Sequence, residues 1–319
     1  MNRAAKTKIV FMGTPQIAVP ILQSLLETPD FEIILVICEP DKTSGRGNQF
    51  IPSAIKDYAQ KHRLDILQPE KIVQIKSKLI KLKPNLAVVT AYGQIIPKEI
   101  IDIFKHGIIN VHFSLLPSWR GASPIQSTIL AGDKTTGTSL MLIDEKMDTG
   151  PILAQKKVPV LSDDNFLTLS QKLTAISANI LPKTLLGYLS GKIKPTPQNH
   201  KLATYCQMIK KEAGLLDFTK PAITLEREIR SYVNWPKSYS FWDKKRLIIK
   251  NAKAIPNIPE PPASAGTVFL DQHLKLPAVL AGTGSLLLLE LQLEGKKPQT
   301  GTEFMNGYPD FIGSILKNN

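Results

Sequence analysis

The chain has 319 residues, of which 43% are hydrophobic and 21% are charged. This length and composition predict an ordinary globular protein with two domains, each large enough for its own core. The basic residues near the start precede only four apolar residues, Ile9–Met12, so we expect no secretory signal. No apolar run approaches the roughly 20 residues that cross a bilayer, so we expect no membrane association. Two cysteines, Cys38 and Cys206, indicate reduced thiols in a cytoplasmic protein.

Positive charge is spread unevenly along the chain, whose net charge is +13. Between Lys192 and Lys253 there are fourteen Lys or Arg residues and five Asp or Glu residues, whereas the remaining C-terminal part carries four and six. A basic block of this kind indicates a polyanionic partner, above all a nucleic acid. The alternative is a lysine-rich surface that only faces solvent.

Apolar runs alternate with amphipathic segments in the first third of the chain. The spacing predicts buried strands over Lys8–Met12, Glu32–Cys38, Leu86–Thr90 and Gly107–His112, and helices over Ile17–Glu27, Ser53–His62 and Ile72–Leu82. Strands that alternate with helices in this way form an open, mostly parallel α/β sheet of the Rossmann-like kind. Such sheets bind ligands at the carboxyl ends of their strands.

Polar side chains end the last of these strands. Asn110 and His112 are two residues apart, so they share one face of a strand and can enter one pocket. A second apolar run, Ser139–Ile143, leads to Asp148 in a turn that ends at Gly150. An amide donor, an imidazole and a carboxylate at strand ends are groups that acyl transfer uses. The alternative is structural: Asn110 and His112 satisfy buried backbone groups, and Asp148 caps a turn.

Other ligand motifs do not match. Gly13 supplies one of the three glycines of a G-x-G-x-x-G turn, and no G-x-x-x-x-G-K-[ST] run is present, which argues against NAD and P-loop chemistry. No cluster of His, Cys, Asp and Glu has the spacing of zinc ligands, so we expect no metal.

The character of the chain changes after residue 190. A helix over Leu167–Leu189 is predicted to close a catalytic domain of residues 1–190, and the stretch 191–208, with two prolines and several lysines, is predicted to be a linker. For residues 209–319 the pattern predicts one short helix and then strands joined by turns: Leu225–Val233, followed by Ser238–Trp242, Arg246–Ile249, Gly266–Leu270, Leu274–Val279 and Ser285–Leu293. This order indicates a small OB-like β-barrel, a fold that commonly binds nucleic acid.

Aromatic residues interleave with the basic residues of this second domain. They are Trp235, Tyr239, Phe241 and Trp242. We expect half of them to lie in the core rather than on a stacking surface.

Three motifs resemble those of the folate-dependent formyltransferases. They read Asn110-x-His112-x-Ser114-Leu115-Leu116-Pro117, Trp119-Arg120-Gly121-Ala122-x-Pro124-Ile125-Gln126 and Met147-Asp148-Thr149-Gly150. Four further motifs are similar to the branch of this family that acts on methionyl-tRNA: Gly13-Thr14-Pro15, Glu212-Ala213, Asn234-Trp235-Pro236 and Glu294-Gly295-Lys296-Lys297-Pro298. The resemblance extends from about Lys8 to Asn306, nearly the whole chain.

The resemblance implies a one-carbon transferase of translation initiation. It implies 10-formyltetrahydrofolate as the formyl donor and the α-amino group of initiator methionyl-tRNA as the acceptor. Attack of a neutral amine on the formyl carbon creates an oxyanion, to which Asn110 and a protonated His112 can donate, typically ~3 to 4 kcal/mol per donor. Asp148 would orient the imidazole and assist removal of the amine proton. Neither cysteine lies in these motifs, so no covalent intermediate is needed.

Binding residues also follow from the resemblance. A folate pocket is implied at Ser114, Leu115, Leu116 and Pro117 and at Ala91, Tyr92, Gly93, Gln94 and Ile95, where apolar walls and backbone groups suit a flat pterin. Contacts with tRNA are implied at Lys42 and Arg46, in the loop after the second strand, and at Lys210 and Lys211.

The loop departs from the family pattern because Asn48 and Gln49 replace two lysines, which removes two potential phosphate contacts. We expect the basic segment Lys192–Lys253 to compensate by holding the tRNA body through its phosphates, so that binding weakens steeply with salt.

Two other functions stay open on the sequence alone. A formyltransferase that acts on a small or sugar-linked amine would keep the first domain but would not need a basic barrel. A non-enzymatic RNA-binding protein built on a decayed transferase is disfavoured, because Asn110, His112 and Asp148 are all present. We expect a monomer.

Overall fold

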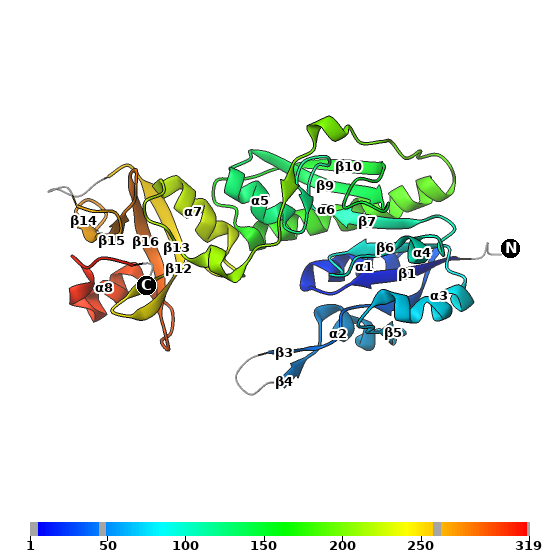
Figure 1. Cartoon of the computed structure of the whole chain (residues 1–319), viewed down its shortest axis with the longest axis horizontal. Coiled ribbons are helices and arrows are strands. Elements are labelled where there is room, and N and C mark those ends of the chain that lie inside the picture. Colours follow the sequence, from blue (N-terminus) through cyan, green and yellow to red (C-terminus); the bar gives the residue numbers. More distant parts are fainter. Residues whose placement is uncertain (1–5, 45–48, 258–262, 318–319) are drawn as a thin grey trace. The chain divides into compact units, whose positions relative to one another are not determined.

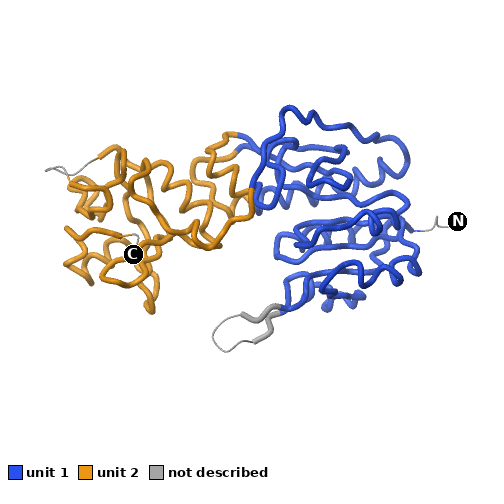
Figure 2. Tube along the Cα trace, in the orientation of Figure 1, with its two compact units in different colours: residues 1–124, 135–159, 170–206 blue, residues 125–134, 160–169, 207–319 orange. Residues whose placement is uncertain are grey.

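A computed structural model describes residues 6–44, 49–257 and 263–317, and gives only the backbone for 42–44 and 49–51. The chain divides into two compact units (Figure 2). Unit 1 contains residues 1–124, 135–159 and 170–206, and unit 2 contains residues 125–134, 160–169 and 207–319. The chain thus passes between the units several times. Within the described ranges, no helix is long and apolar enough to span a membrane.

Unit 1 is built on one seven-stranded sheet with the order β10-β9-β7-β6-β1-β2-β5 (Figure 1). Its strands are β1 (Thr7–Gly13), β2 (Phe31–Ile37), β5 (Ile66–Leu67), β6 (Leu86–Thr90), β7 (Ile108–His112), β9 (Thr135–Leu142) and β10 (Ile152–Pro159). The five strands from β7 to β5 run parallel to one another, and β9 and β10 add two antiparallel strands at one edge. The prediction of an open, mostly parallel sheet is confirmed.

The first strands form where the apolar runs predict them, because both faces of a central parallel strand are buried. Five successive residues of β1, Ile9–Gly13, are buried, and so is all of β6. One face of the sheet packs against α3 (Lys76–Leu82) and α4 (Lys98–Ile101) through a cluster that includes Val10, Leu79 and Ile100. The other helical elements before residue 207 are η1 (Gln16–Ala18), α1 (Val19–Leu26), α2 (Ala54–Lys61), η2 (Ile72–Ile75), α5 (Pro124–Ala131), α6 (Phe166–Leu189) and η3 (His200–Leu202).

Two short strand pairs complete this part of the chain. β3 (Lys42–Ser44) and β4 (Gln49–Ile51) form an antiparallel hairpin in the loop after β2. β8 (Arg120–Gly121) pairs in parallel with β11 (Tyr205–Cys206). Residues 205–206 of the predicted linker 191–208 are therefore paired with another segment of unit 1.

Unit 2 contains an antiparallel sheet with the order β12-β13-β16-β15-β14, and β17 pairs with β16. Its strands are β12 (Tyr239–Trp242), β13 (Lys245–Ile255), β14 (Val268–Asp271), β15 (Leu276–Leu280), β16 (Ser285–Leu293) and β17 (Gln299–Thr300), and its helical elements are η4 (Lys211–Gly214), α7 (Ala222–Ser231), α8 (Gly301–Gly307) and η5 (Pro309–Phe311). The last described residues join the two edge strands: Ile315 bridges to Thr267 beside β14, and Lys317 bridges to Phe241 of β12. This closure supports the predicted OB-like barrel.

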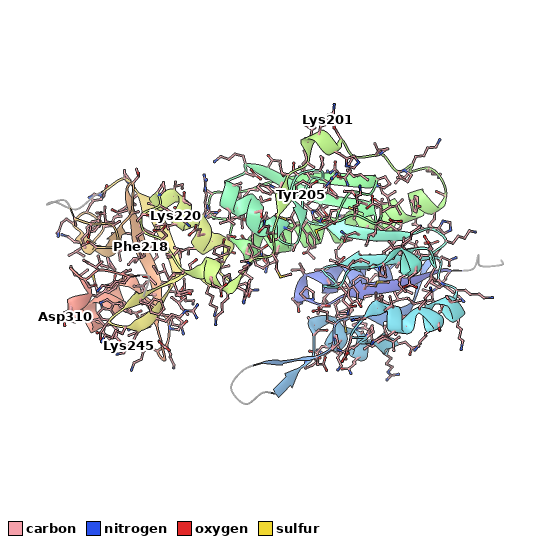
Figure 3. The ribbon with its side chains drawn as sticks, viewed as in Figure 1. Lys201, Tyr205, Phe218, Lys220, Lys245 and Asp310 are labelled. Carbon is pink, nitrogen blue, oxygen red and sulfur yellow. The ribbon has the colours of Figure 1, made fainter. Side chains whose placement is uncertain are left out.

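Aromatic side chains fill one end of this unit. Trp242 packs edge-on against Phe304, Tyr308 and Phe311, with ring centroids 5.4–5.8 Å apart. Phe218 also lies inside the unit, whereas Lys245 and Asp310 are exposed (Figure 3). Trp235, by contrast, is 49% exposed.

Candidate active site

The strand order places β7, which carries the predicted catalytic residues Asn110 and His112, next to β9, the strand that leads to Asp148. β7 lies between β6 and β9, and Asn110 and His112 pair in register with Met141 and Ser139 of β9. After β9 the chain turns back toward β10 through Asp148, which has a left-handed φ of +52°. Gly150 closes this turn, and a side chain there would place its Cβ 1.9 Å from the Leu142 carbonyl oxygen.

The side chains of Asn110, His112 and Asp148 meet. Asn110 Nδ2 donates to Asp148 Oδ1 over 3.3 Å, and His112 Nδ1 lies 3.7 Å from Asp148 Oδ2. The side chains of His112 and Asp148 are only 6% and 13% exposed. The backbone N–H of Gly121 also donates to Asp148 Oδ2, over 2.8 Å. Both oxygens of this carboxylate are therefore held in place.

The second nitrogen of His112 has a different partner. Nε2 lies 3.0 Å from the carbonyl oxygen of Trp119. A carbonyl oxygen only accepts, so Nε2 carries a proton. Donation from Nε2 to a substrate oxygen therefore requires that the ring share this proton with Trp119 or turn away from it.

The segment 196–206 pairs with the start of β10 and with β8. Thr196 bridges to Ile152, Thr204 accepts the backbone N–H of Arg120, and Cys206 pairs with Gly121; the segment can be followed from Lys201 to Tyr205 in Figure 3. A side chain at Gly121, whose φ is +121°, would place its Cβ 2.1 Å from the Cys206 carbonyl oxygen. Only glycine allows this close pairing, which aims the Gly121 N–H at Asp148.

The predicted folate loop 114–117 is fixed by its neighbours on β9 and β10. Ser114 Oγ donates to the Ser118 carbonyl over 2.6 Å, and Ser139 Oγ donates to the Ser114 carbonyl over 2.7 Å. The Gln155 amide donates to the Leu116 carbonyl over 2.8 Å. Leu116 is buried, whereas Leu115 and Pro117 are half-buried and can offer apolar surface to a ligand.

The second predicted folate loop, 91–95, follows β6 at the place where the strand order reverses. Ala91 and Gly93 have positive φ angles, and Ile95 is 85% exposed. The side chains of Tyr92 and Gln94 do not point toward a folate pocket. Tyr92 is buried in the core, where burial raises the pKa of its hydroxyl, and the Gln94 amide bonds to Pro69 and Ile72 of a neighbouring loop.

The predicted tRNA residues are only partly described. Lys210 and Lys211 are exposed near the start of the last segment of unit 2, residues 207–319. Arg46 and Asn48 lie outside the described residues, as do the side chains of Lys42 and Gln49. Within the described ranges, no group of three or more His, Cys, Asp and Glu residues is placed to hold a metal ion.

Sequence reasoning missed several residues that hold this site together. Arg120 and Gly121 lie in the motif that begins at Trp119, which is the only sequence signal for them, and no individual role could be assigned to them from the sequence. Gln198 lay in the predicted linker, where no sequence pattern marks a buried amide; it is 7% exposed.

Comparison with known proteins shows the family to which the chain belongs. A family model for formyl transferases matches residues 7–185, and a model for their C-terminal domain matches residues 208–309. The chain is 40% identical to the methionyl-tRNA formyltransferase of Myxococcus xanthus over 97% of its own length and 98% of that protein. It is a formyl transferase. A second relative, the methionyl-tRNA formyltransferase of Bacillus subtilis, is 38% identical to this formyl transferase over 97% of the chain and 98% of that protein.

Solved structures share the fold at lower identity. WlaRD, a sugar 3N-formyl transferase solved with dTDP and 5-N-formyl-THF, is similar with a TM-score of 0.66 and 19% identity, over 92% of this formyl transferase and 100% of that chain. HypX from Aquifex aeolicus, solved with tetrahydrofolic acid, gives a TM-score of 0.62 and 14% identity over 98% of this chain and 49% of that one.

Proposed function

We propose that this formyl transferase moves a formyl group from 10-formyltetrahydrofolate to the α-amino group of methionyl-tRNA. The observation that carries the proposal is the meeting of Asn110, His112 and Asp148 in a chain that is 40% identical, nearly end to end, to a methionyl-tRNA formyltransferase. The basic segment Lys192–Lys253, with exposed Lys210 and Lys211, supports a polyanionic acceptor.

Asn110 is suited to stabilise the oxyanion that forms when the amine attacks the formyl carbon. One N–H of its amide donates to Asp148 and holds the group in orientation, which leaves the second N–H for the substrate oxygen. A preset donor of this kind is typically worth ~3 to 4 kcal/mol in the transition state.

His112 and Asp148 are suited to handle the proton that the amine loses. As the new C–N bond forms, the amine nitrogen becomes positive and must release a proton before the C–N10 bond of the donor breaks. The Asp148 carboxylate can accept that proton directly or through water, while N10 of tetrahydrofolate takes up a proton as it leaves. A His112 ring protonated at both nitrogens would stabilise the carboxylate through Nδ1.

The two predicted folate loops, residues 91–95 and 114–117, fit a folate donor. Half-buried Leu115 and Pro117 and exposed Ile95 provide apolar surface, and Ala91 and Gly93 expose backbone beside it. The buried ring of Tyr92 would shape this loop from behind rather than touch the pterin. The bound donor supplies the activated formyl group, and the chain supplies orientation and the proton path.

A direct assay offers labelled 10-formyltetrahydrofolate with methionylated initiator tRNA, uncharged initiator tRNA and glycinamide ribonucleotide in parallel. The proposal predicts labelled product with methionyl-tRNA alone. Product on the small amine would favour a small-molecule formyltransferase, and release of free formate without any product would indicate a hydrolase. Binding of tRNA without turnover would indicate a non-enzymatic RNA-binding protein.

We also infer that the protein acts as a monomer in the cytoplasm. One chain supplies every residue used above. Light scattering during size-exclusion chromatography tests this, and a dimer mass at micromolar concentration would refute it.

A further inference from the structure

A buried arginine is connected to the backbone of Asp148 through one glutamine. Arg120 is 1% exposed and is the largest fully buried side chain of the described residues. Its Nε and Nη2 donate to Gln198 Oε1 over 3.2 and 2.7 Å. Gln198 Nε2 in turn donates to the carbonyl oxygens of Asp148 and Gly150, over 2.9 and 2.7 Å. Gln198 is therefore hydrogen-bonded to the backbone of the Asp148 turn on both sides of Thr149.

The strand β8, which contains Arg120, also holds the side chain of Asp148. Gly121, next to Arg120 in β8, donates its N–H to the Asp148 carboxylate over 2.8 Å. Asp148 has a left-handed φ of +52°, a conformation that costs energy for a residue with a side chain. Such a conformation persists only when its surroundings fix it, and here Arg120, Gly121 and Gln198 do so.

The buried charge of Arg120 does not stabilise the fold, because its hydrogen-bond partners are neutral. Its third contact is from Nη2 to Nδ1 of His200, at 2.9 Å, and because a guanidinium only donates, this ring nitrogen accepts. The partners of the buried charge are thus an amide and a neutral imidazole. Burying a charge among neutral groups lowers stability compared with a well-packed apolar side chain of similar size. A role in holding the turn accounts for the arrangement, whereas stability does not.

We propose that Arg120 and Gln198 are positioning residues, which hold Asp148 so that its carboxylate faces Asn110 and His112. The inference rests on the proposed function, because it assumes that Asp148 takes part in formyl transfer. Neither residue touches the reacting atoms; Arg120 fixes Gln198, and Gln198 fixes the turn.

Two substitutions at Gln198 separate positioning from simple packing. Gln198→Met keeps the volume but removes both donors and the acceptor. Gln198→Glu keeps an acceptor for Arg120 and removes only the two donors to Asp148 and Gly150. Misplacing a catalytic group by about 1 Å costs up to about 100-fold in rate, so we expect kcat for methionyl-tRNA to fall about 10- to 100-fold in both variants. The KM values for tRNA and folate should change less than about threefold.

Asn85→Ala provides the matched control. The Asn85 side chain accepts the Lys8 N–H over 2.7 Å at the amino-terminal end of the sheet, so this variant also removes a side chain-to-backbone hydrogen bond. It should lower the melting temperature without lowering kcat. If Gln198→Met and Gln198→Glu keep the kcat of the control variant, Arg120 and Gln198 are structural only and the proposal is wrong.

A spectroscopic readout makes the test independent of turnover. The ring signals of the five histidines are recorded by 15N NMR, and His112 is assigned by its absence in His112→Ala. Gln198→Met should shift the His112 signals, and Asn85→Ala should not. Unchanged His112 signals together with unchanged kcat would overturn the proposal. Shifted signals in a protein that formylates no methionyl-tRNA would instead refute the proposed function and leave the positioning intact.

Arg120→Met supplies a second site for the test. Because it replaces a buried charge with an apolar chain, we expect a melting temperature close to that of Gln198→Met and the same loss of kcat. If Arg120→Met does not fold, the Gln198 variants decide the question alone.

Discussion

One oxygen of Asp148, Oδ2, lies 3.7 Å from Nδ1 of His112. It also accepts the Gly121 N–H over 2.8 Å, while the other oxygen accepts from Asn110. A protonated His112 would have an acceptor at each nitrogen, the Trp119 carbonyl at Nε2 and this carboxylate at Nδ1. The negative charge of Asp148 is therefore the feature that connects the other two residues.

Replacing Asp148 with Asn tests that charge. The amide keeps the shape of the side chain but can no longer accept the amine proton or stabilise a charged ring. General-base contributions are typically 10²- to 10⁴-fold, so kcat should fall at least about 100-fold with little change in melting temperature. Glu145→Gln, on the same loop and 67% exposed, is the control and should keep full activity. Equal activity of the two variants would remove Asp148 from the mechanism.

Gly121→Ala tests the pairing of β8 with β11. The new Cβ would lie 2.1 Å from the Cys206 carbonyl oxygen, so the two strands must separate and the N–H would leave Asp148. We expect a loss of about 2 kcal/mol or more in unfolding free energy together with reduced kcat. Gly191→Ala is the matched control, because Gly191 also has a positive φ but a Cβ there meets no atom within 4 Å. It should cost only about 1 kcal/mol and leave kcat unchanged. Similar effects at both positions would mean that backbone strain alone, and not the strand pairing, explains the loss.

Reversing the charges of Lys210 and Lys211 tests the tRNA surface. The double Lys→Glu variant should raise KM for methionyl-tRNA, and the slope of log KM against log salt should fall by roughly 0.7 to 0.9 for each phosphate that the variant no longer neutralises. The same double reversal at Lys78 and Lys81, which are exposed in and beside the C-terminal turn of α3, changes net charge equally and should have little effect. A rise in KM of the same size in both variants would show that only overall charge matters.

The barrel should lose stability in acid partly through Asp271. Backbone N–H donation from Leu274, and then a hydrogen bond from the Asn257 side chain, hold the pKa of this buried carboxyl below its usual value of 3.8. A depressed folded-state pKa stabilises the fold at pH values above the unfolded pKa, and this stabilisation disappears as pH falls through the folded pKa.

Urea unfolding of Asp271→Asn at several pH values measures this contribution. The variant should be about 1 kcal/mol less stable than the parent at pH 7, and the difference should shrink below about pH 4. Asp310→Asn, at an exposed position, should match the parent throughout. A difference at Asp271 that stays constant into acid would contradict the assigned cause.

Parts of both sheets could be predicted because some of their central strands are largely buried apolar runs. Leu86–Thr90 and Ser285–Leu293 form strands with the predicted bounds. β10 was not predicted, since Gln155, Lys156 and Lys157 are three exposed residues in a row and give an edge strand no apolar pattern. β9 begins at Thr135, before the predicted Ser139, because its first part is buried but polar and gives no apolar pattern. Thr138, for example, is satisfied by long-range hydrogen bonds with the His112 carbonyl and the Ser177 hydroxyl.

The candidate site was predictable where its residues lie in motifs and unpredictable where they lie outside them. Asn110, His112 and Asp148 were recognised together by family resemblance, and the fold brings them together as the strand argument required. Gln198 could not be recognised, because its burial depends on a chain segment returning across β10 long after the catalytic turn. The closure of the barrel by Ile315 and Lys317 has no local sequence signal for a similar reason, because each pairs with a residue far away in the sequence.

The most direct test of this account is single-turnover formyl transfer by His112→Ala, with methionyl-tRNA affinity measured in parallel at low salt. The account predicts that transfer from 10-formyltetrahydrofolate falls at least about 100-fold while tRNA affinity stays within about twofold of the parent, because His112 serves the reaction and not tRNA binding. Transfer at the parental rate would contradict the assignment of Asn110, His112 and Asp148 as the catalytic site.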